Sequence, residues 1–383
     1  MASIRVEVNK RVLSWALERA KVGTDLQRKF PRLSDWLTGA AQPTLRQLEE
    51  FAKATSVPFG YLLLPEPPQE RLPIPHFRTL VGVSAEHFSA DLLDTVQIMQ
   101  RRQAWMREYF IEQGHEPLPF VRSASPRTDP RVVAQQIRGT LGLNADWASR
   151  QPNWTVALRV LQEKAEDAGI VVVVSGIVGN NARRKLNVEE FRGFVLVDEY
   201  APLVFINGAD GKAAQMFTLA HELAHVWLGK SASFDLRDLQ PAPDETEQAC
   251  NHIAAEFLVP ADSLREYLPS ARLDPDPFQA IARRFKVSEI VAARRLLDLD
   301  LISREKFFDF YQEYQARERR QAGRQAGGDF YATQSLRLGR RFGEAVVRAT
   351  KEGRLLYDEA YRLTGLYGKT FERFAEFILG MRK

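Results

Sequence analysis

The feature that most constrains the fold of this chain is the stretch of residues 216–228, which reads MFTLAHELAHVWL. It contains neither Pro nor Gly, and Gly229 follows it, so the pattern predicts a single helix that ends there. Apolar side chains occur all round such a helix, which is typical of a helix that neighbouring elements bury on every side. The fold must therefore bury a helix that also carries two histidines and a glutamate.

These three residues, His221, Glu222 and His225, form the pattern H-E-x-x-H. Positions i and i+4 share one face of a helix, so both imidazoles can bind one metal ion. Glu222 projects beside that face, where it can accept a proton from a water that the metal activates. Buried histidines without a metal need other polar partners, because an unsatisfied polar group costs free energy. The pattern predicts a Zn²⁺ hydrolase site, with Mn²⁺ as the alternative ion.

A catalytic zinc site takes three protein ligands and keeps one position open, so a third ligand must follow. Residues 245–259 are expected to form a helix that ends near Pro260. Glu247 and Asn251 share one side of it, which allows Glu247 to bind the metal while Asn251 orients a ligating histidine. Glu256, nine residues later on the same helix, is the main alternative. The full set of candidates is Asp235, Asp238, Asp244, Glu245, Glu247, His252 and Glu256.

Two further residues of this helix leave alternatives open. His252 can assist the oxyanion of the transition state or lie at the surface. Cys250 can bind zinc as a thiolate, or pack as a small buried residue. It is the only cysteine of the chain, which excludes an internal disulfide and a cysteine-rich zinc site and favours a reducing, cytoplasmic setting.

A small sheet is expected before the metal-site helix. Residues 170–174 form a continuous apolar run typical of a buried strand. Two more strands, 194–197 and 203–206, are separated by a hairpin-length loop. The strand at 203–206, or a neighbour, could take a substrate peptide as an added strand. Together these elements predict an α+β fold that is mostly helical.

Residues 1–64 contain four or five short helices, which suits a compact helix-turn-helix bundle. Thr44 is the expected N-cap of one of them. The run PTLRQLEEFAKATSVPFGYLLLP resembles the back half of a phage-repressor-type (XRE-like) domain. That resemblance implies a recognition helix at 33–37 and DNA contacts from Arg28, Lys29 and Arg32. Pro31 departs from the pattern, so a bundle used for dimerisation or protein contact is the alternative.

The rest of the chain divides into further expected segments. Helices are predicted at 90–113, 131–142 and 154–168, and Ser288 is the expected N-cap of a later helix. The predicted segments are a Pro-rich linker at 65–80, a helical region at 81–168, a metal-site core at 169–262, a helix-turn-helix-like unit at 263–300 and a helical domain at 301–383.

Charge is spread unevenly along the chain. Residues 1–75 carry 11 basic and 8 acidic side chains, and residues 301–383 carry 17 and 11, whereas residues 76–300 carry 25 and 30. Basic ends allow a nucleic-acid role. Candidate phosphate contacts are Arg294 and Arg295, with simple solvation as the alternative. A candidate basic face is formed by Arg337, Arg340, Arg341 and Arg348, and packing of the C-terminal helices onto the metal-site core is the slightly favoured alternative. No apolar run is long enough to span a bilayer, so no membrane partner is expected.

The metal-site segments together resemble the ImmA/IrrE family of metallopeptidases. The matching residues are FTLAHELAH at 217–225, Glu247, Asn251 and AAEFLVP at 254–260. The resemblance implies a zincin-like core with His221, His225 and Glu247 as ligands and Glu222 as general base. Cys250 stands where the family usually has Ala. An XRE-like unit followed by a linker and this core is an order also seen in family members.

The family resemblance implies a narrow protein substrate, typically a DNA-binding repressor that is cut to switch on genes in a stress, mobile-element or defence response. One alternative is a DNA-binding regulator, or an antitoxin-like partner of a toxin, that uses the fold only for binding. Another is a peptidase held inactive until a ligand reaches the C-terminal region. A homodimer is a further open possibility.

Overall fold

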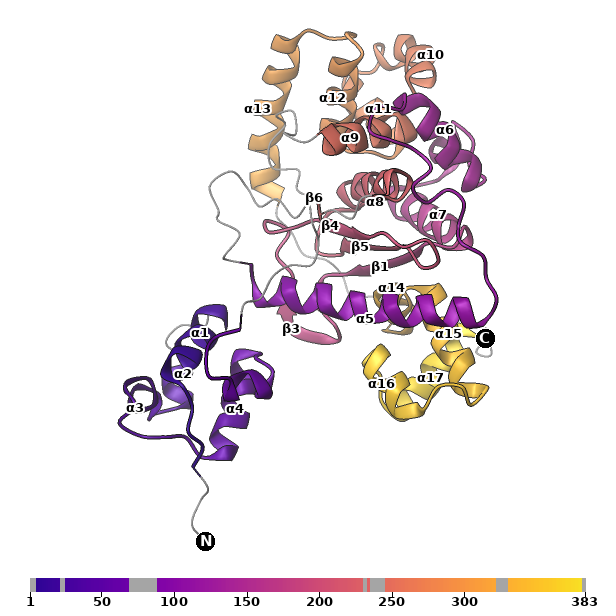
Figure 1. Cartoon of the computed structure of the whole chain (residues 1–383). Helices are drawn as coiled ribbons and strands as arrows, with labels where there is room; N and C mark the ends of the chain where they lie inside the picture. The colour runs from indigo at the N-terminus through magenta and orange to yellow at the C-terminus, as the bar shows by residue number, and fades with distance from the viewer. Residues whose placement is uncertain are drawn as a thin grey trace. The chain divides into compact units, whose positions relative to one another are not determined.

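The computed structural model describes residues 5–20, 25–68, 88–229, 233–234, 245–321 and 330–380. These residues are mostly helical and include a small mixed sheet (Figure 1), which confirms the predicted α+β class. Their contacts divide them into two units, residues up to Val96 and residues from Gln97 onward. Most of the expected linker at 65–80 and the glycine-containing stretch at 322–328 lie outside the described residues. The finer segment boundaries remain predictions.

The first unit contains five short helical segments. They are α1 (Lys10–Ala20), α2 (Asp25–Lys29), α3 (Leu33–Thr38), α4 (Leu45–Thr55) and the 3₁₀ helix η1 (Phe59–Leu63). Thr44 caps α4 as predicted: its hydroxyl accepts from the Gln47 N–H, and the Gln47 side chain accepts from the Thr44 N–H. This reciprocal capping box fixes the start of α4.

The second unit is built around a four-stranded sheet in the order β1-β5-β4-β6. Its strands are β1 (Val171–Ser175), β5 (Leu203–Asn207), β4 (Gly193–Leu196) and β6 (Ser233–Phe234). β1 and β5 are parallel, and β4 forms the predicted hairpin with β5. Because β5 is paired on both sides, the prediction that the strand at 203–206 takes a substrate peptide is wrong for that strand. The neighbouring β4 carries β6 on its outer edge at Gly193 and Phe194.

A second hairpin, β2 (Ile177–Val178) with β3 (Asn181–Lys185), was not predicted. β3 reads NARRK and is largely exposed. Without apolar alternation, a strand of this kind gives no periodic signal in the sequence.

Helix α8 (Lys212–Leu228) packs on β4 and β5, and three other helices complete its burial. They are α9 (Glu245–Leu258), α6 (Pro130–Thr140) and α7 (Trp154–Asp167). All α8 residues from Gln215 to Leu228 are buried. Gly229 ends α8 as predicted, with a left-handed φ of 72° that suits glycine. The expected burial of this helix on every side is thus present.

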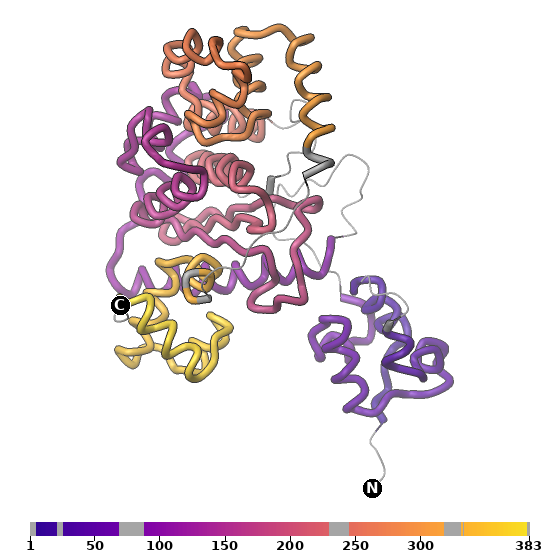
Figure 2. The backbone as a smooth tube through the Cα atoms, turned by 180° about the vertical axis from the view of Figure 1, so that it is seen from behind, coloured from indigo at the N-terminus to yellow at the C-terminus, as the bar shows by residue number. Residues whose placement is uncertain are grey.

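The remaining helices lie on both sides of this core. They are α5 (Ala90–Glu112), η2 (Trp147–Arg150), α10 (Ala261–Ala271), α11 (Pro277–Phe285), α12 (Glu289–Asp298), α13 (Arg304–Gln321), α14 (Phe330–Leu338), α15 (Arg340–Lys351), α16 (Tyr357–Thr364) and α17 (Lys369–Ile378). Figure 2 shows α14–α17, in yellow, on the opposite side of the sheet from α10–α13, in orange. Ser288 caps α12, as predicted. Within the described chain, no helix is both long and apolar enough to cross a membrane.

Two of the four arginines of the candidate basic face, Arg340 and Arg341, pack against the core, as the packing alternative expects. Arg340 bonds to Glu166 and Asp167 at the end of α7, and the Arg341 guanidinium lies 4.7 Å from the centre of the Phe110 ring. Both side chains therefore join the C-terminal helices to the core rather than forming a free basic surface.

Candidate metal centre

The two histidines of α8 meet at a buried point next to α9. His221 and His225 lie one helical turn apart, both are fully buried, and their Nε2 atoms are 3.1 Å apart. Glu247 lies in the first turn of α9. Its Oε2 atom is 3.2 Å from His221 Nε2, and its Oε1 atom is 3.2 Å from His225 Nε2. The structure thus brings together all three predicted ligands.

The protons of this cluster show why it suits a cation. Asn251 Oδ1 lies 3.0 Å from His221 Nδ1, so this nitrogen carries a proton and His221 Nε2 presents a lone pair. Burial lowers the pKa of His221, which disfavours a second proton on the ring. Nε2 faces the Glu247 carboxylate 3.2 Å away. A metal ion at this point could be shared by the Nε2 lone pair and the carboxylate.

The spacing of the donor atoms also fits a metal. Metal–ligand bonds of about 2.0–2.1 Å at tetrahedral angles place donor atoms about 3.3 Å apart. The three donor–donor separations are 3.1, 3.2 and 3.2 Å. Asn251 supplies the hydrogen bond that fixes the ring of a ligating histidine, as predicted for a residue four positions after Glu247. Two imidazoles and a carboxylate at these distances can hold Zn²⁺ or Mn²⁺.

Glu222 lies beside this cluster and is fully buried. Neither of its carboxylate oxygens has a hydrogen-bond partner among the described residues. Burial raises the pKa of Glu222 well above its ordinary value, and the charge of Glu247 raises it further. A carboxyl group with a raised pKa next to a metal position is suited to accept and return a proton.

Glu247 has the opposite electrostatics. Burial by itself raises the pKa of Glu247, but its contacts with the two imidazoles outweigh burial and hold that pKa below the ordinary value. The site thus contains one carboxylate that stays ionised and one that holds a proton more tightly. Such a division is typical of a ligand and an acid–base group.

Gly193 contributes to the site and was not singled out in the sequence. A Cβ atom on Gly193 would lie 2.6 Å from the Thr218 side chain and 3.4 Å from a Glu222 oxygen. Glycine therefore allows β4 to pass close to the helix that carries Glu222. The only signal in the sequence was a glycine directly before an expected strand.

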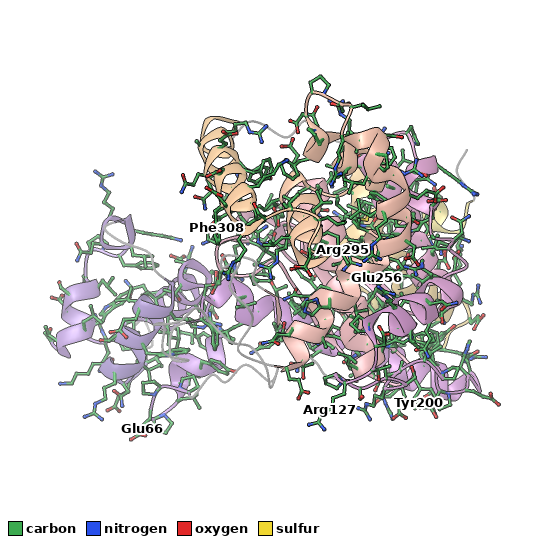
Figure 3. The ribbon with its side chains drawn as sticks, turned by 90° about the horizontal axis from the view of Figure 1, so that it is seen from above. Glu66, Arg127, Tyr200, Glu256, Arg295 and Phe308 are labelled. Carbon is green, nitrogen blue, oxygen red and sulfur yellow. The ribbon has the colours of Figure 1, made fainter. Side chains whose placement is uncertain are left out.

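The other ligand candidates lie elsewhere or beyond the described residues. Glu256 is buried but bonds to Arg295 of α12 (Figure 3), and its other oxygen accepts from the Ala261 N–H. His252 and Glu245 are exposed. Cys250 is fully buried, and its sulfur lies within 4.8 Å of ligand nitrogens of both histidines. Three candidates, Asp235, Asp238 and Asp244, lie outside the described residues.

The residues predicted to contact nucleic acid differ in their exposure to solvent. Arg28, Lys29 and Arg32 are exposed on the first unit, and Arg32 pairs with Asp35 at 3.1 Å. Arg295 is buried against Glu256, so its proposed phosphate contact is wrong.

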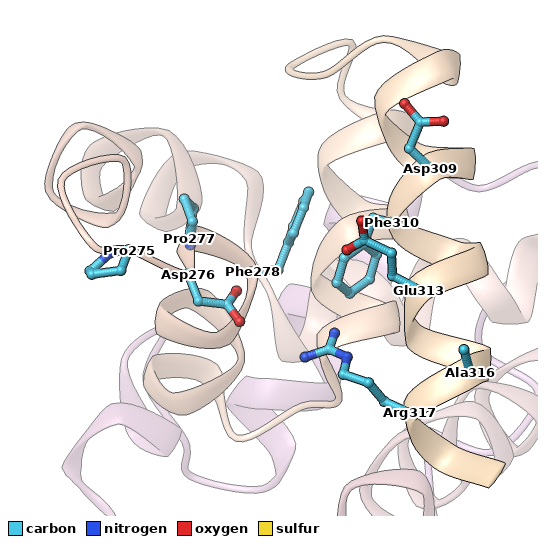
Figure 4. Close-up of a pocket in the computed structure, with 9 residues that line it drawn as sticks. All are labelled: Pro275, Asp276, Pro277, Phe278, Asp309, Phe310, Glu313, Ala316 and Arg317. Carbon is cyan, nitrogen blue, oxygen red and sulfur yellow. The ribbon is translucent and has the colours of Figure 1, made fainter. Parts of the chain in front are cut away.

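A separate hollow of about 640 Å³ lies between the start of α11 and α13 (Figure 4). Phe278 and Phe310 face each other there, with their ring centres 4.3 Å apart. None of the metal-centre residues lines it.

Helix α8 carries the buried H-E-x-x-H residues over a small sheet, and α9 adds a carboxylate. This arrangement is typical of a zincin-like hydrolase site. Residues 165–297 match a peptidase family model described as an IrrE N-terminal-like domain, which supports a metallopeptidase domain of ImmA/IrrE type over this segment. Residues 338–377 match a family described as a domain of unknown function (DUF8813). No curated protein matches the chain.

Proposed function

We propose that this protein is a zinc-dependent endopeptidase that cleaves a specific regulatory protein, a DNA-binding repressor, and so controls gene expression in a stress, mobile-element or defence response. The observation that carries the enzymatic part is the convergence of His221, His225 and Glu247 within 3.2 Å of one another, beside buried Glu222. The peptidase family match over residues 165–297 supports the same part, and the regulatory part extends the family resemblance of the sequence.

His221, His225 and Glu247 would hold the metal ion, and Asn251 would keep the His221 ring in its ligating orientation. When bound, the ion supplies Lewis acidity, which makes water nucleophilic near neutral pH and polarises a peptide carbonyl. Glu222 accepts the proton of the attacking water on its carboxylate. It then delivers that proton to the nitrogen of the leaving amine, which allows the C–N bond to break.

The proposal is tested by labelling new protein N-termini in a lysate of the source cells, after incubation with zinc-loaded wild-type protein or with Glu222→Gln. We expect one or a few new termini, within a DNA-binding regulator, that the wild type alone generates. Equal patterns from both proteins would contradict the peptidase function. Many unrelated Glu222-dependent termini would contradict the narrow substrate while retaining the peptidase.

A DNA-binding regulator or antitoxin-like role is the second candidate, favoured by the exposure of Arg28 and Lys29 at the end of α2 and of Arg32 just before α3. If these residues bind phosphates, replacing all three with Ala should weaken DNA binding and reduce its salt dependence. Fluorescence anisotropy with duplex DNA at several salt concentrations measures both effects. Unchanged binding would leave the first unit as a bundle for protein contact.

A further inference from the structure

Cys250 occupies a position in the metal centre that the proposed ligand set does not use. Glu247, Cys250 and Asn251 stand at i, i+3 and i+4 of α9, so they share the face that is turned toward α8. Glu247 and Asn251 both contact His221 from this face. The Cys250 sulfur, between them in sequence, lies within 4.8 Å of the ligand nitrogens of both histidines.

This position is within reach of a common metal ion. Zinc–sulfur bonds of about 2.3 Å and zinc–nitrogen bonds of about 2.0–2.1 Å at a tetrahedral centre place the sulfur about 3.5 Å from each nitrogen. The limit of 4.8 Å exceeds this separation by about 1.3 Å, which metal binding would have to close. Burial keeps the sulfur in the protein interior, on the ligand side of α9.

We propose that Cys250 is a fourth protein donor to the metal, so that the resting centre is closed by two histidines, Glu247 and a thiolate. Binding replaces the S–H proton, which passes to the solvent. A site with four protein ligands is typical of structural zinc, whereas catalysis needs one open position. The sulfur must therefore leave the metal before Glu222 can act on a water there, a step that rests on the proposed peptidase function.

A thiolate donor also selects the ion. Soft sulfur ligands favour zinc, whereas manganese prefers oxygen donors. The two-histidine, one-carboxylate set alone suits both ions, so Cys250 is the group that would make this centre a zinc site. An alanine at this position would leave the same three ligands without that preference.

X-ray absorption at the zinc edge of the full-length, zinc-loaded protein tests the proposal directly. We expect a sulfur neighbour at about 2.3 Å in the wild type, and nitrogen and oxygen neighbours alone in Cys250→Ala. Cys250→Ala should still bind one zinc per chain, which shows that it folds and keeps the other ligands. Because Cys250 is the only cysteine, this variant removes every thiol from the chain.

Cobalt substitution gives a second readout that does not depend on cleavage. The wild type should show a thiolate-to-cobalt charge-transfer band, and azide should change its spectrum little. Cys250→Ala should lose the band and respond strongly to azide, because its fourth position is open.

A wild-type centre that binds zinc without a sulfur neighbour would overturn the inference and leave the proposed function standing. If neither protein binds zinc, the proposed function itself fails.

Discussion

The two ends of α9 carry buried carboxylates with different tasks. Glu247, in its first turn, faces two imidazole nitrogens at 3.2 Å. Glu256, in its last turn, pairs with the buried guanidinium of Arg295. The two residues are nine positions apart, which is two and a half turns, so an ideal helix points them to opposite sides and separates them by about 13.5 Å along its axis.

The difference shows that opposite sides of one helix can hold a metal ligand and a structural ion pair. The end of α9 near Glu247 packs against the histidine turn of α8, whereas the other end is held by α12 and α6. Arg295 donates to the Val259 carbonyl as well as to Glu256, and Arg138 donates to the Glu256 and Phe257 carbonyls. One end of the helix thus serves chemistry, and the other fixes the helix in place.

The sharpest test of the chemical end is Glu222→Gln. Glutamine keeps the shape of the side chain but cannot accept the proton, so cleavage should fall by about 10²–10⁴-fold. Metal content should stay near that of the wild type, because Glu222 is not a ligand. Quantifying the wild-type-specific N-termini alongside metal analysis checks both. Loss of the metal in this variant would mean that Glu222 is itself a ligand.

The structural end is tested by Glu256→Ala. This change leaves Arg295 buried without its carboxylate partner, which should lower the free energy of unfolding by about 3–5 kcal/mol. Urea denaturation of metal-free protein measures it. Glu247→Ala is the matched control on the same helix: it should abolish metal binding and destabilise the metal-free protein much less. If Glu256→Ala loses the metal instead, the two ends do not have separate tasks.

A third buried carboxylate, Glu166, extends the comparison to the C-terminal helices. Burial raises the pKa of Glu166 to about 7, although the Arg341 N–H and the Arg340 guanidinium partly oppose this effect. The native state therefore keeps a proton that the unfolded chain releases near pH 4.5. Stability should fall by about 3 kcal/mol as the pH rises from 4.5 to 7, and little further above that range.

Urea denaturation across this pH range, with Glu166→Gln as the reference, isolates the contribution of the carboxyl group. The free energy of unfolding of the wild type, relative to that of Glu166→Gln, should fall as the pH rises from 4.5 to 7. A difference independent of pH would show that Glu166 stays ionised in its ion pair with Arg340.

The sequence predicted most of the elements around the metal centre because their signals are local. The strands at 170–174, 194–197 and 203–206 appear within one residue of their expected ends as β1, β4 and β5. The four-residue spacing of His221 and His225 predicted that they share one face of the helix. Thr44 and Ser288 cap their helices as expected. Short-range periodicity and capping chemistry are enough for each of these features.

What the sequence left open depends on contacts between distant segments. Glu247 and Glu256 lie on opposite sides of α9, and only the position of α8 shows which side faces the histidines. The parallel pairing of β1 with β5 placed β5 inside the sheet and removed its free edge. Arg340 looked like surface charge until the structure placed Glu166 against it. None of these pairings has a signal within one short stretch of the chain.

The smallest expected effect belongs to Asn251, which acts on the metal through His221. Asn251→Ala removes the hydrogen bond that fixes the Nδ1 proton and the ring orientation, so metal affinity should fall by about 10–100-fold. Asn251→Asp, which retains an acceptor, should restore most of that loss. Competition with a chelator of known affinity measures each variant against the wild type. If Asn251 served only packing, Asp would not restore the metal affinity. Equal losses of affinity in both variants would therefore show that Asn251 does not orient the His221 ring.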